Sequence, residues 1–339
     1  MSLINVGLIG AGRIGRVHAK NLAYRIPEVR IIAVSDILIE AAKKLADDFQ
    51  IPAVFEDRRH IMENKDIEAV IICSSTDTHA QMIEEAAVAG KHIFCEKPID
   101  HDLARIDRVL GIVERAGVKL QVGFNRRFDP NFKRVQEIVA SGDIGEPHIL
   151  RITSRDPALP PIKYIQSSGG IFLDMTIHDF DMARFLINSE VEEIFAVGGV
   201  LVDPKIGEAG DIDTAVTILR FKNGAIGTID NSRQAVYGYD QRVEVFGSGG
   251  CVAADNNYPN TTFISDARRV HRDLPLNFFM ERYAESYIVE MKVFVESVLE
   301  DKVPPVTGID GRIPVVMAYA AKKSLQENRP VKLSEVDRA

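Results

Sequence analysis

The stretch that decides the fold lies near the start of the chain and reads Ile4-Asn5-Val6-Gly7-Leu8-Ile9-Gly10-Ala11-Gly12-Arg13-Ile14-Gly15. Its first half is mostly apolar and has the length of one buried strand, and its second half is a Gly-x-Gly-x-x-Gly turn. The residues that follow, up to Arg25, contain no proline, so we expect a helix there. A strand, a glycine-rich turn and a helix in this order are typical of a dinucleotide-binding site.

Each glycine of the turn has a separate expected task. Gly10 permits the tight turn, Gly12 lets the backbone approach a pyrophosphate, and Gly15 lets the helix pack against the strand. The free N–H groups at the start of the helix would face the phosphates. A plain strand–helix turn is the alternative interpretation. We predict that the cofactor contacts Gly10, Ala11, Gly12, Arg13 and Ile14.

Asp36 indicates which dinucleotide binds. It follows a second expected strand, residues 30–35, at roughly the spacing from the turn at which a carboxylate holds the adenosine ribose. A carboxylate accepts hydrogen bonds from a free 2′-hydroxyl and repels a 2′-phosphate, and the next residues, Ile37 and Leu38, supply no guanidinium. The pattern therefore favours NAD over NADP. The alternative is that Asp36 only caps the helix expected over residues 38–49.

The composition limits the class of protein. A length of 339 residues suggests two domains, and 46% hydrophobic with 27% charged residues is typical of a globular chain. A net charge of −8 argues against nucleic acid or an anionic membrane as the main partner. We expect no signal peptide, and the sequence has no apolar run of about 18 residues. The three cysteines, Cys73, Cys95 and Cys251, lack paired spacing, so we expect a cytoplasmic protein without disulfides.

Strand and helix patterns alternate through the first half of the chain. We expect strands at 4–9, 30–35, 53–55, 69–73, 92–96 and 120–123, and helices near 13–25, 38–49, 57–63, 78–89 and 102–116. The strands are apolar on both faces, as in a doubly wound parallel sheet covered by helices. Ligands of such α/β sheets bind beyond the carboxyl ends of the strands. Thr76 as a helix cap and His79 as an ordinary first-turn residue are alternatives. The polar residues predicted to contact the cofactor there are Ser74, Ser75, Thr76, His79, Glu96 and Lys97.

The pattern changes near residue 124. A helix is expected at 130–141 and strands at 148–154, 192–202, 213–222, 225–233 and 242–247, with a hairpin turn at Asn223-Gly224. Helices at 284–299 and 312–326 close the chain, and residues 169–186 have the pattern of one helix opened by two glycines. Strands joined by tight turns indicate an antiparallel sheet. We therefore predict an α/β domain over residues 1–123 and an α+β domain over 124–339.

The candidate chemistry joins the helix expected over 169–186 to Lys97. Asp174 and His178 are four residues apart and would share one helical face. A neutral histidine can take a proton from a hydroxyl, and a neighbouring carboxylate would orient its ring. Lys97, at the carboxyl end of a strand, could stabilise developing alkoxide charge. These groups suit the oxidation of a secondary alcohol with hydride transfer to NAD⁺.

Other interpretations of these residues exist. An Asp–His pair at this spacing is often a surface or cap contact, and Lys97 alone could be a solvated lysine. A metal site is a further alternative, but its four candidate ligands, at i, i+4, i+5 and i+7, do not all share one helical face, and no cysteine or second histidine is near. We therefore expect no metal. The residues of that alternative are Asp174, His178, Asp179 and Asp181.

Four motifs together resemble the glucose–fructose oxidoreductase/inositol dehydrogenase family: residues 10–15, Cys95-Glu96-Lys97-Pro98, residues 123–129 and residues 174–179. The likeness covers nearly the whole chain, and residues 169–184 and 231–242 look specifically like the inositol dehydrogenases of that family. The resemblance implies an N-terminal Rossmann domain and a C-terminal domain with an open, mostly antiparallel sheet. In this family the open face commonly builds dimers and tetramers, so we expect a homotetramer.

The resemblance also implies roles for individual residues. His178 would be the base, Asp174 its partner, and Lys97 the cation that orients the hydroxyl; the Lys97–Pro98 peptide is often cis in relatives. Sheet packing is the alternative for Tyr237, and a phosphate or surface contact is the alternative for Arg126. The implied substrate-contacting residues are Lys97, Asn125, Arg126, Asp156, Asp174, Thr176, His178 and Tyr237.

The implied substrate is a small neutral cyclic polyol, with myo-inositol oxidised at C2 to 2-keto-myo-inositol. Its hydroxyls donate and accept, so a selective site needs both kinds of partner, which carboxylates, Tyr237, Arg126 and Lys97 can supply. Asn125 stands where some inositol dehydrogenases carry methionine, which leaves another inositol isomer or an aldose as alternatives. A non-catalytic NAD(H)-binding sensor is the alternative from another class, and the presence of Lys97, Asp174 and His178 argues against it.

Overall fold

The computed structural model describes residues 3–337, and the chain forms two compact units. Unit 1 combines the residues up to Phe128 with Glu285–Ile313, and unit 2 combines Asp129–Ala284 with the residues from Pro314 onward. This division differs from the linear boundary expected at residue 124. The reason is α12 (Ala284–Leu299), which carries apolar side chains into the core of unit 1 although it lies far along the chain.

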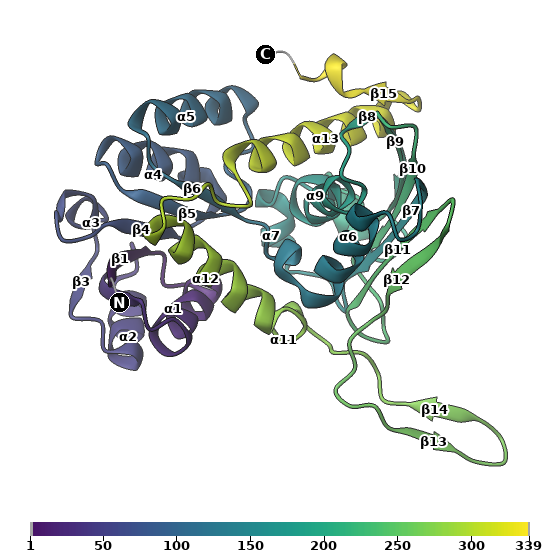
Figure 1. The fold of residues 1–339 in the computed structure, drawn as a ribbon, viewed down its shortest axis with the longest axis horizontal. Helices are drawn as coiled ribbons and strands as arrows, with labels where there is room; N and C mark the ends of the chain where they lie inside the picture. Colours follow the sequence, from purple (N-terminus) through teal and green to yellow (C-terminus); the bar gives the residue numbers. More distant parts are fainter. Residues whose placement is uncertain (1–2, 338–339) are drawn as a thin grey trace. The chain divides into compact units, whose positions relative to one another are not determined.

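Unit 1 is built on a six-stranded parallel sheet with the order β3-β2-β1-β4-β5-β6 (Figure 1). This is the strand order of the doubly wound dinucleotide-binding fold. All six predicted strands are present, with ends that differ from the prediction by at most one residue. Their bounds are β1 (Ile4–Ile9), β2 (Val29–Ser35), β3 (Ala53–Phe55), β4 (Ala69–Ile72), β5 (His92–Glu96) and β6 (Leu120–Gly123).

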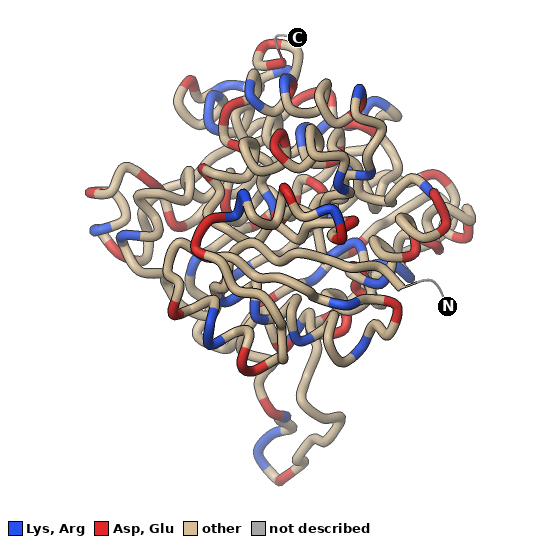
Figure 2. The backbone as a smooth tube through the Cα atoms, turned by 90° about the vertical axis from the view of Figure 1, so that its left-hand side faces the viewer, with Lys and Arg blue, Asp and Glu red and all other residues tan. Residues whose placement is uncertain are grey.

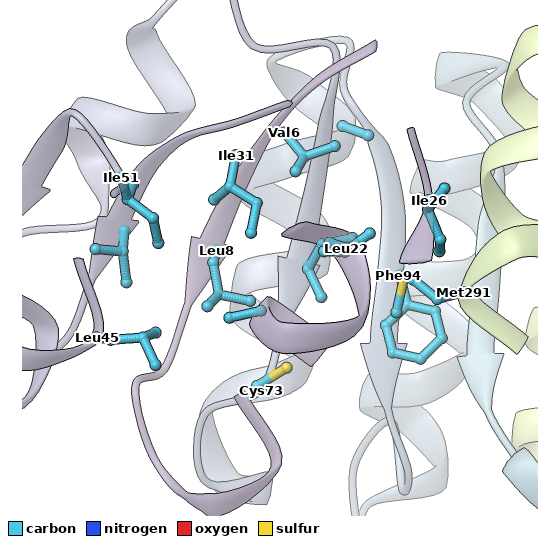
Figure 3. Close-up of a cluster of buried hydrophobic side chains, with 14 of the residues drawn as sticks. Val6, Leu8, Leu22, Ile26, Ile31, Leu45, Ile51, Cys73, Phe94 and Met291 are labelled. Carbon is cyan, nitrogen blue, oxygen red and sulfur yellow. The ribbon is translucent and has the colours of Figure 1, made fainter. Parts of the chain in front are cut away.

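Helices cover both faces of this sheet. On one face, α1 (Arg13–Arg25), α2 (Ile39–Phe49) and α12 enclose a core to which Leu22, Leu45 and Met291 contribute, together with Leu8 and Phe94 from the strands (Figure 3). A fully buried side chain of this size stabilises the fold by about 1.5–3 kcal/mol. On the other face, α4 (Thr76–Val88) packs against α5 (Leu103–Ala116), while α3 (Arg59–Glu63) follows β3 (Figure 1).

Unit 2 is built on a seven-stranded sheet with the order β12-β11-β7-β10-β9-β8-β15. Strands β7 and β10 are parallel, and the other neighbouring pairs are antiparallel, so the sheet is mostly antiparallel as predicted. The predicted hairpin joins β9 to β10 and turns through Asn223 and Gly224, whose φ is +91°. The strands are β7 (Pro147–Arg155), β8 (Val191–Gly199), β9 (Thr214–Phe221), β10 (Ile226–Ser232), β11 (Asp240–Gly247), β12 (Gly250–Ala254) and β15 (Val331–Lys332).

One face of the unit 2 sheet is covered by α6 (Pro130–Ser141) and α9 (Thr176–Ile187), which contact β7, β10, β11 and β12. A small hairpin, β13 (Phe263–Ser265) and β14 (Val270–Arg272), projects from the unit (Figure 1). The sequence patterns did not predict this hairpin or the short helices. The remaining helices are α7 (Ile162–Ser167), α8 (Ile171–Asp174), α10 (Pro204–Glu208), α11 (Phe279–Arg282), α13 (Gly308–Glu327) and the 3₁₀ turns η1 (Asn125–Phe128) and η2 (Leu333–Glu335).

The single helix predicted over residues 169–186 is wrong. The chain forms two helices, α8 and α9, that are interrupted at Met175, where φ is −94° and ψ is −60°. The N–H of His178 bonds to the carbonyl of Met175 at 3.3 Å, which is a tighter turn than an α-helix makes. Asp174 therefore ends one helix and His178 lies in the next, so they do not share the face of a continuous helix.

Charges of both signs are distributed along the whole chain. Figure 2 shows lysine and arginine interspersed with aspartate and glutamate rather than gathered in one track. The sequence total is 41 basic against 49 acidic residues, so the net charge of −8 is spread over many small opposing contributions. Within residues 3–337, no helix has both the length and the apolar composition that crossing a membrane requires.

Candidate active site

Unit 1 contains a cavity of about 830 Å³ beyond the carboxyl ends of β1, β2 and β4. This is where the topology of a doubly wound sheet places a dinucleotide. Five of the predicted cofactor residues line it: Gly10, Gly12, Asp36, Ser74 and Ser75. The other predicted cofactor residues are not part of its wall. The sequence patterns missed a further set of residues in the cavity wall: Glu56, Asp57, Arg58, Arg59, Thr78, Gln81, Met82 and Glu85.

The three glycines of the turn meet different surroundings. Gly10 has a φ of +101°, and a Cβ there would lie 2.6 Å from the Cys73 carbonyl. A Cβ on Gly15 would lie 2.0 Å from the carbonyl oxygen of Gly10, so only glycine permits the approach of α1 to β1. A Cβ on Gly12 would meet no atom within 4 Å. The space beside Gly12 is therefore open to a group from outside the chain, which fits a pyrophosphate at the start of α1.

Asp36 is fixed by two backbone N–H groups. Its Oδ2 accepts a hydrogen bond from Ala11 at 2.7 Å, and its Oδ1 accepts one from Leu38 at 2.8 Å. The carboxylate thus ties the end of β2 to the glycine turn. The N-cap of α2 is Leu38 and no side chain caps this helix, so the helix-cap alternative for Asp36 is wrong. Each carboxylate oxygen has a second lone pair, so these bonds are compatible with a ribose hydroxyl as a further donor.

The residues that follow β4 are connected by hydrogen bonds. Ser74 Oγ lies 2.7 Å from Thr78 Oγ1, which donates to the Ser75 carbonyl at 2.7 Å. The N-cap residue of helix α4 is Ser75, so Thr76 is the first residue of the helix and not its cap. His79 is buried, with Nδ1 2.8 Å from the Pro98 carbonyl and Nε2 3.0 Å from the Ser74 carbonyl. It therefore links the ends of β4 and β5.

The end of β5 carries a buried acidic site. Glu96 lies 2.7 Å from Nε2 of His18, which is fully buried on α1. Burial, followed by the charge of Glu96, raises the pKa of Glu290 on α12 well above its ordinary value. Lys97 follows at the strand end with a partly exposed side chain, and the Lys97–Pro98 peptide is cis. Asn125 and Arg126 are both buried in η1, after β6.

In unit 2, Asp174 is held by two side chains that the sequence patterns did not single out. Tyr164 donates to Oδ1 at 2.7 Å, and Nη1 of Arg233 donates to Oδ2 at 3.1 Å. Arg233 is only 1% exposed and also bonds Asp211 at 3.4 Å. Burial, and then the charge of Asp174, raises the pKa of Tyr164 above its ordinary range, and Asp156 adds to this shift. Asp174 is therefore a fixed carboxylate rather than a mobile surface group.

His178 lies one residue beyond Ile177 in the first turn of α9 and is partly exposed. Beside it, the Thr176 hydroxyl donates to Asn231 at 2.8 Å, and Asn231 donates to Asp179 at 2.8 Å. These three side chains are buried and pin the start of α9 to β10. Lys97 belongs to unit 1 and His178 to unit 2, so the convergence of the predicted catalytic residues stays a prediction.

The last two predicted substrate residues lie near the ends of β7 and β10. Asp156 follows β7, and its backbone bonds Ser232 at 2.9 Å and Ala235 at 2.6 Å. The Tyr237 hydroxyl donates to Asp240 and accepts from Arg155 at 3.0 Å. Tyr237 lies in the turn between β10 and β11, so the sheet packing weighed as its alternative does not describe its position. Substrate contact by Tyr237 stays a prediction.

No group of three or more histidine, cysteine, aspartate or glutamate side chains is arranged to hold a metal ion in the part of the chain that the structure covers. Asp179, one of the residues considered for a metal, bonds the amide of Asn231. The three cysteines are unpaired thiols; Cys73 and Cys95 are buried and Cys251 is exposed.

Two family models match the chain. The model described as "Oxidoreductase family, NAD-binding Rossmann fold" matches residues 4–124, and that of the "GFO/IDH/MocA C-terminal domain" matches residues 132–253. Both predicted fold types are confirmed by these matches, and the predicted cofactor, NAD, agrees with the description of the first.

Individual relatives are similar over the full length of the chain. Myo-inositol 2-dehydrogenase of Thermotoga maritima is 51% identical over 98% of this chain and 99% of its own. The crystal structure of a myo-inositol dehydrogenase from Corynebacterium glutamicum is 38% identical with a TM-score of 0.93, covering 98% of this chain and 99% of that one. The scyllo-inositol dehydrogenase of Lactobacillus casei, solved with NAD(H) and scyllo-inositol, is 29% identical with a TM-score of 0.92, covering 98% and 100%.

Proposed function

The chain belongs to the GFO/IDH/MocA family of NAD-binding oxidoreductases, and from that premise we propose that it oxidises myo-inositol at C2 to 2-keto-myo-inositol. The observation that carries the proposal is the 51% identity to the Thermotoga myo-inositol 2-dehydrogenase over 98% of the chain. Scyllo-inositol is the second candidate, because a scyllo-inositol dehydrogenase has nearly the same fold, with a TM-score of 0.92.

Unit 1 supplies the cofactor site in this proposal. The open space beside Gly12 and the N–H groups at the start of α1 receive the pyrophosphate, while the carboxylate of Asp36, held by Ala11 and Leu38, receives the adenosine ribose. Exposed Ile37 and Leu38 at the cavity rim offer apolar contact to the adenine. When bound, NAD⁺ accepts the hydride from the carbinol carbon of the substrate.

Unit 2 supplies the proton acceptor. In the proposed reaction His178 takes the proton of the substrate hydroxyl, and the carboxylate of Asp174 stabilises the imidazolium that results. Tyr164 and Arg233 hold that carboxylate in place before substrate arrives. Lys97 donates to the reacting oxygen and stabilises its developing negative charge. The remaining hydroxyls of the ring would be bound by Asn125, Arg126, Asp156, Thr176 and Tyr237.

We also propose that the enzyme works in the cytoplasm as a homotetramer. The uncovered face of the unit 2 sheet supports the assembly, because several apolar side chains on it are 42–48% exposed. Cross-strand pairing places Val197 beside Val216, and Ile226 lies between Arg220 and Ile149, so these residues share one face. Several exposed apolar side chains on one face of a sheet are typical of a subunit interface.

The test of the substrate is a panel of myo-inositol, scyllo-inositol, chiro-inositol and glucose with NAD⁺, followed by the near-ultraviolet absorbance of NADH. We expect the highest kcat/KM for myo-inositol and weak turnover of glucose. Each missing or inverted hydroxyl leaves a polar group of the site without its partner, and such mismatches reduce kcat/KM strongly. A clear preference for scyllo-inositol would show that the proposed substrate, myo-inositol, is wrong, while the proposed class of enzyme would stand.

His178→Ala tests the proton acceptor in the same assay. Loss of a general base reduces turnover by about 10²–10⁴-fold, whereas NADH binding, measured by fluorescence titration, should be unchanged. His271→Ala on the projecting hairpin is the matched control and should behave like the original enzyme. Near-normal turnover in the His178 variant would remove this residue from the mechanism.

A further inference from the structure

A second set of charged side chains lies next to Asp36 in the cofactor cavity. Strand β3 pairs with β2, and the N–H of Asp36 bonds to the Phe55 carbonyl at 3.2 Å, so the residues that follow β3 emerge beside Asp36. These residues, Glu56, Asp57, Arg58 and Arg59, line the cavity together with Asp36 and with Glu85 from α4.

Both arginines of this set are engaged by carboxylates. Nε and Nη2 of Arg58 each donate to a different oxygen of Glu85 at 2.8 Å, which is the two-pronged geometry of a strong guanidinium–carboxylate pair. Nε of Arg59 donates to Asp57 at 2.6 Å, and the backbone N–H of Arg59 donates to the other oxygen at 2.9 Å. The hydrogen bonds from Arg59 lower the pKa of Asp57 to about 2, so this carboxylate stays charged at neutral pH.

The charge balance of this set is unfavourable for a phosphate. Four carboxylates against two guanidiniums leave a net charge of −2 at the end of the cavity where Asp36 lies. NADP carries an additional phosphate on the adenosine ribose, and guanidinium groups are the side chains that bind phosphate best. Here the two available guanidiniums already have carboxylate partners, so a phosphate would have to displace Glu85 or Asp57.

We propose that Glu85 and Asp57 are specificity-determining residues that exclude NADP by keeping Arg58 and Arg59 paired. This inference rests on the proposed placement of the adenosine ribose at Asp36. It adds a second layer to cofactor choice: Asp36 repels the phosphate directly, whereas Glu85 and Asp57 withhold the arginines that would otherwise attract it. Removing Asp36 alone leaves three carboxylates against two guanidiniums, and both arginines remain paired.

The experiment measures kcat/KM for NAD⁺ and NADP⁺ with the polyol in saturation. Asp36→Ser provides the background, and Glu85→Gln or Asp57→Asn is added to it, because each amide keeps the shape of the carboxylate and removes its charge. We expect Asp36→Ser to raise kcat/KM for NADP⁺, and each second substitution to raise it by about a further tenfold, since a charge-assisted bond to the phosphate becomes available.

Two controls separate the inference from general effects. Glu84 is the neighbour of Glu85 on α4, and its partner Arg108 lies outside the cofactor cavity. Glu84→Gln, added to Asp36→Ser, should therefore leave kcat/KM for NADP⁺ unchanged. Arg58→Met, added to the Asp36→Ser/Glu85→Gln variant, should cancel the gain in NADP⁺ use. If the Glu85 variant does not fold, the Asp36→Ser/Asp57→Asn variant provides the same test, with Arg59→Met in place of Arg58→Met.

The outcomes distinguish the inference from the placement on which it rests. An unchanged cofactor preference in Asp36→Ser would contradict the placement of the ribose at Asp36. If Asp36→Ser raises NADP⁺ use but neither amide substitution adds to it, the placement stands and the inference is wrong. A gain that survives Arg58→Met in the Glu85 variant would also overturn it, because the guanidinium would then not be the phosphate ligand.

Discussion

Among single residues, Glu290 is a carboxyl group buried on a helix of unit 1. It lies on α12 between Tyr287 and Phe294, whose ring centroids lie 5.7 Å from that of His18 on α1 and 5.9 Å from that of Phe94 on β5, so this face of the helix packs on α1 and β5. Glu290 is fully buried, and neither carboxyl oxygen has a hydrogen-bond partner among residues 3–337. Burial of the carboxyl group, and then the negative charge of Glu96, raise the pKa of Glu290 well above its ordinary value.

The raised pKa of Glu290 predicts how stability changes with pH. In the unfolded chain a glutamate ionises near pH 4.3, whereas in the folded protein Glu290 keeps its proton well above that pH. The folded state therefore binds more protons, and this contribution to the free energy of unfolding falls by about 1.4 kcal/mol per pH unit above the unfolded pKa. Glutamine does not ionise, so the Glu290→Gln variant should not show this fall. Its free energy of unfolding should therefore exceed that of the original protein by an amount that grows from pH 5 upward.

Urea denaturation at several pH values measures this difference. Glu285→Gln, on the same helix but with a side chain that is 61% exposed, is the control and should show no such slope. Curves for Glu290→Gln and the original protein that stay parallel across pH would mean that Glu290 is ionised in the folded state.

At the scale of elements, the glycine turn between β1 and α1 performs two separable tasks. Gly15 serves packing, since its Cβ position is occupied by the Gly10 carbonyl, whereas Gly12 faces open space and has an ordinary φ of −71°. An alanine at Gly15 should therefore reduce the stability of the fold, whereas an alanine at Gly12 should reduce the affinity for the cofactor.

We expect Gly15→Ala to lower the free energy of unfolding by about 1–3 kcal/mol, because α1 must move away from β1. Gly12→Ala should leave stability nearly unchanged and weaken NADH binding by about tenfold, because the methyl group occupies the space of the pyrophosphate. Urea denaturation and fluorescence titration measure the two effects. Equal losses of stability in both variants would contradict this division of tasks.

The interruption between α8 and α9 shows why an element can be predicted in place but not in shape. Buried apolar residues occur before and after the break, at Phe172 and Leu173 and again at Ile177 and Phe180, so the hydrophobic pattern continues across it. The break coincides with Asp174, which Tyr164 and Arg233 hold from other elements. Contacts that join residues 10 and 59 positions apart leave no local signal, and therefore the spacing argument for a shared helical face failed.

At the scale of the whole molecule, the uncovered face of the unit 2 sheet predicts self-association. Ile218 stands at the middle of this face and is 46% exposed, opposite Phe195 on β8 and Thr228 on β10. Burial of such side chains between copies would stabilise an assembly by about 25 cal/mol per Å² of apolar area. A charge at this position would have to be buried without a partner in the assembly.

Ile218→Lys should therefore dissociate the proposed tetramer into smaller species while the free energy of unfolding of each subunit changes little. Light scattering coupled to size exclusion measures the mass in solution. Val88→Lys replaces a more exposed apolar residue, 77% exposed at the end of α4, and should leave the mass unchanged. An Ile218→Lys protein with the mass of the original would exclude this face as the interface.

The sequence by itself determined the first domain, because its strands are apolar on both faces, its turns are short, and the glycines act through backbone geometry that needs no distant partner. It also located Asp36 and the Asn223-Gly224 hairpin for the same local reason. Only the tertiary structure decided that α12 completes the core of unit 1, that Tyr164 and Arg233 fix Asp174, and that Arg58 and Glu85 meet in the cofactor cavity. Each of those contacts joins side chains that are far apart in the sequence. Hydrophobic periodicity reports which face of an element is buried and does not identify the distant residue that the face contacts.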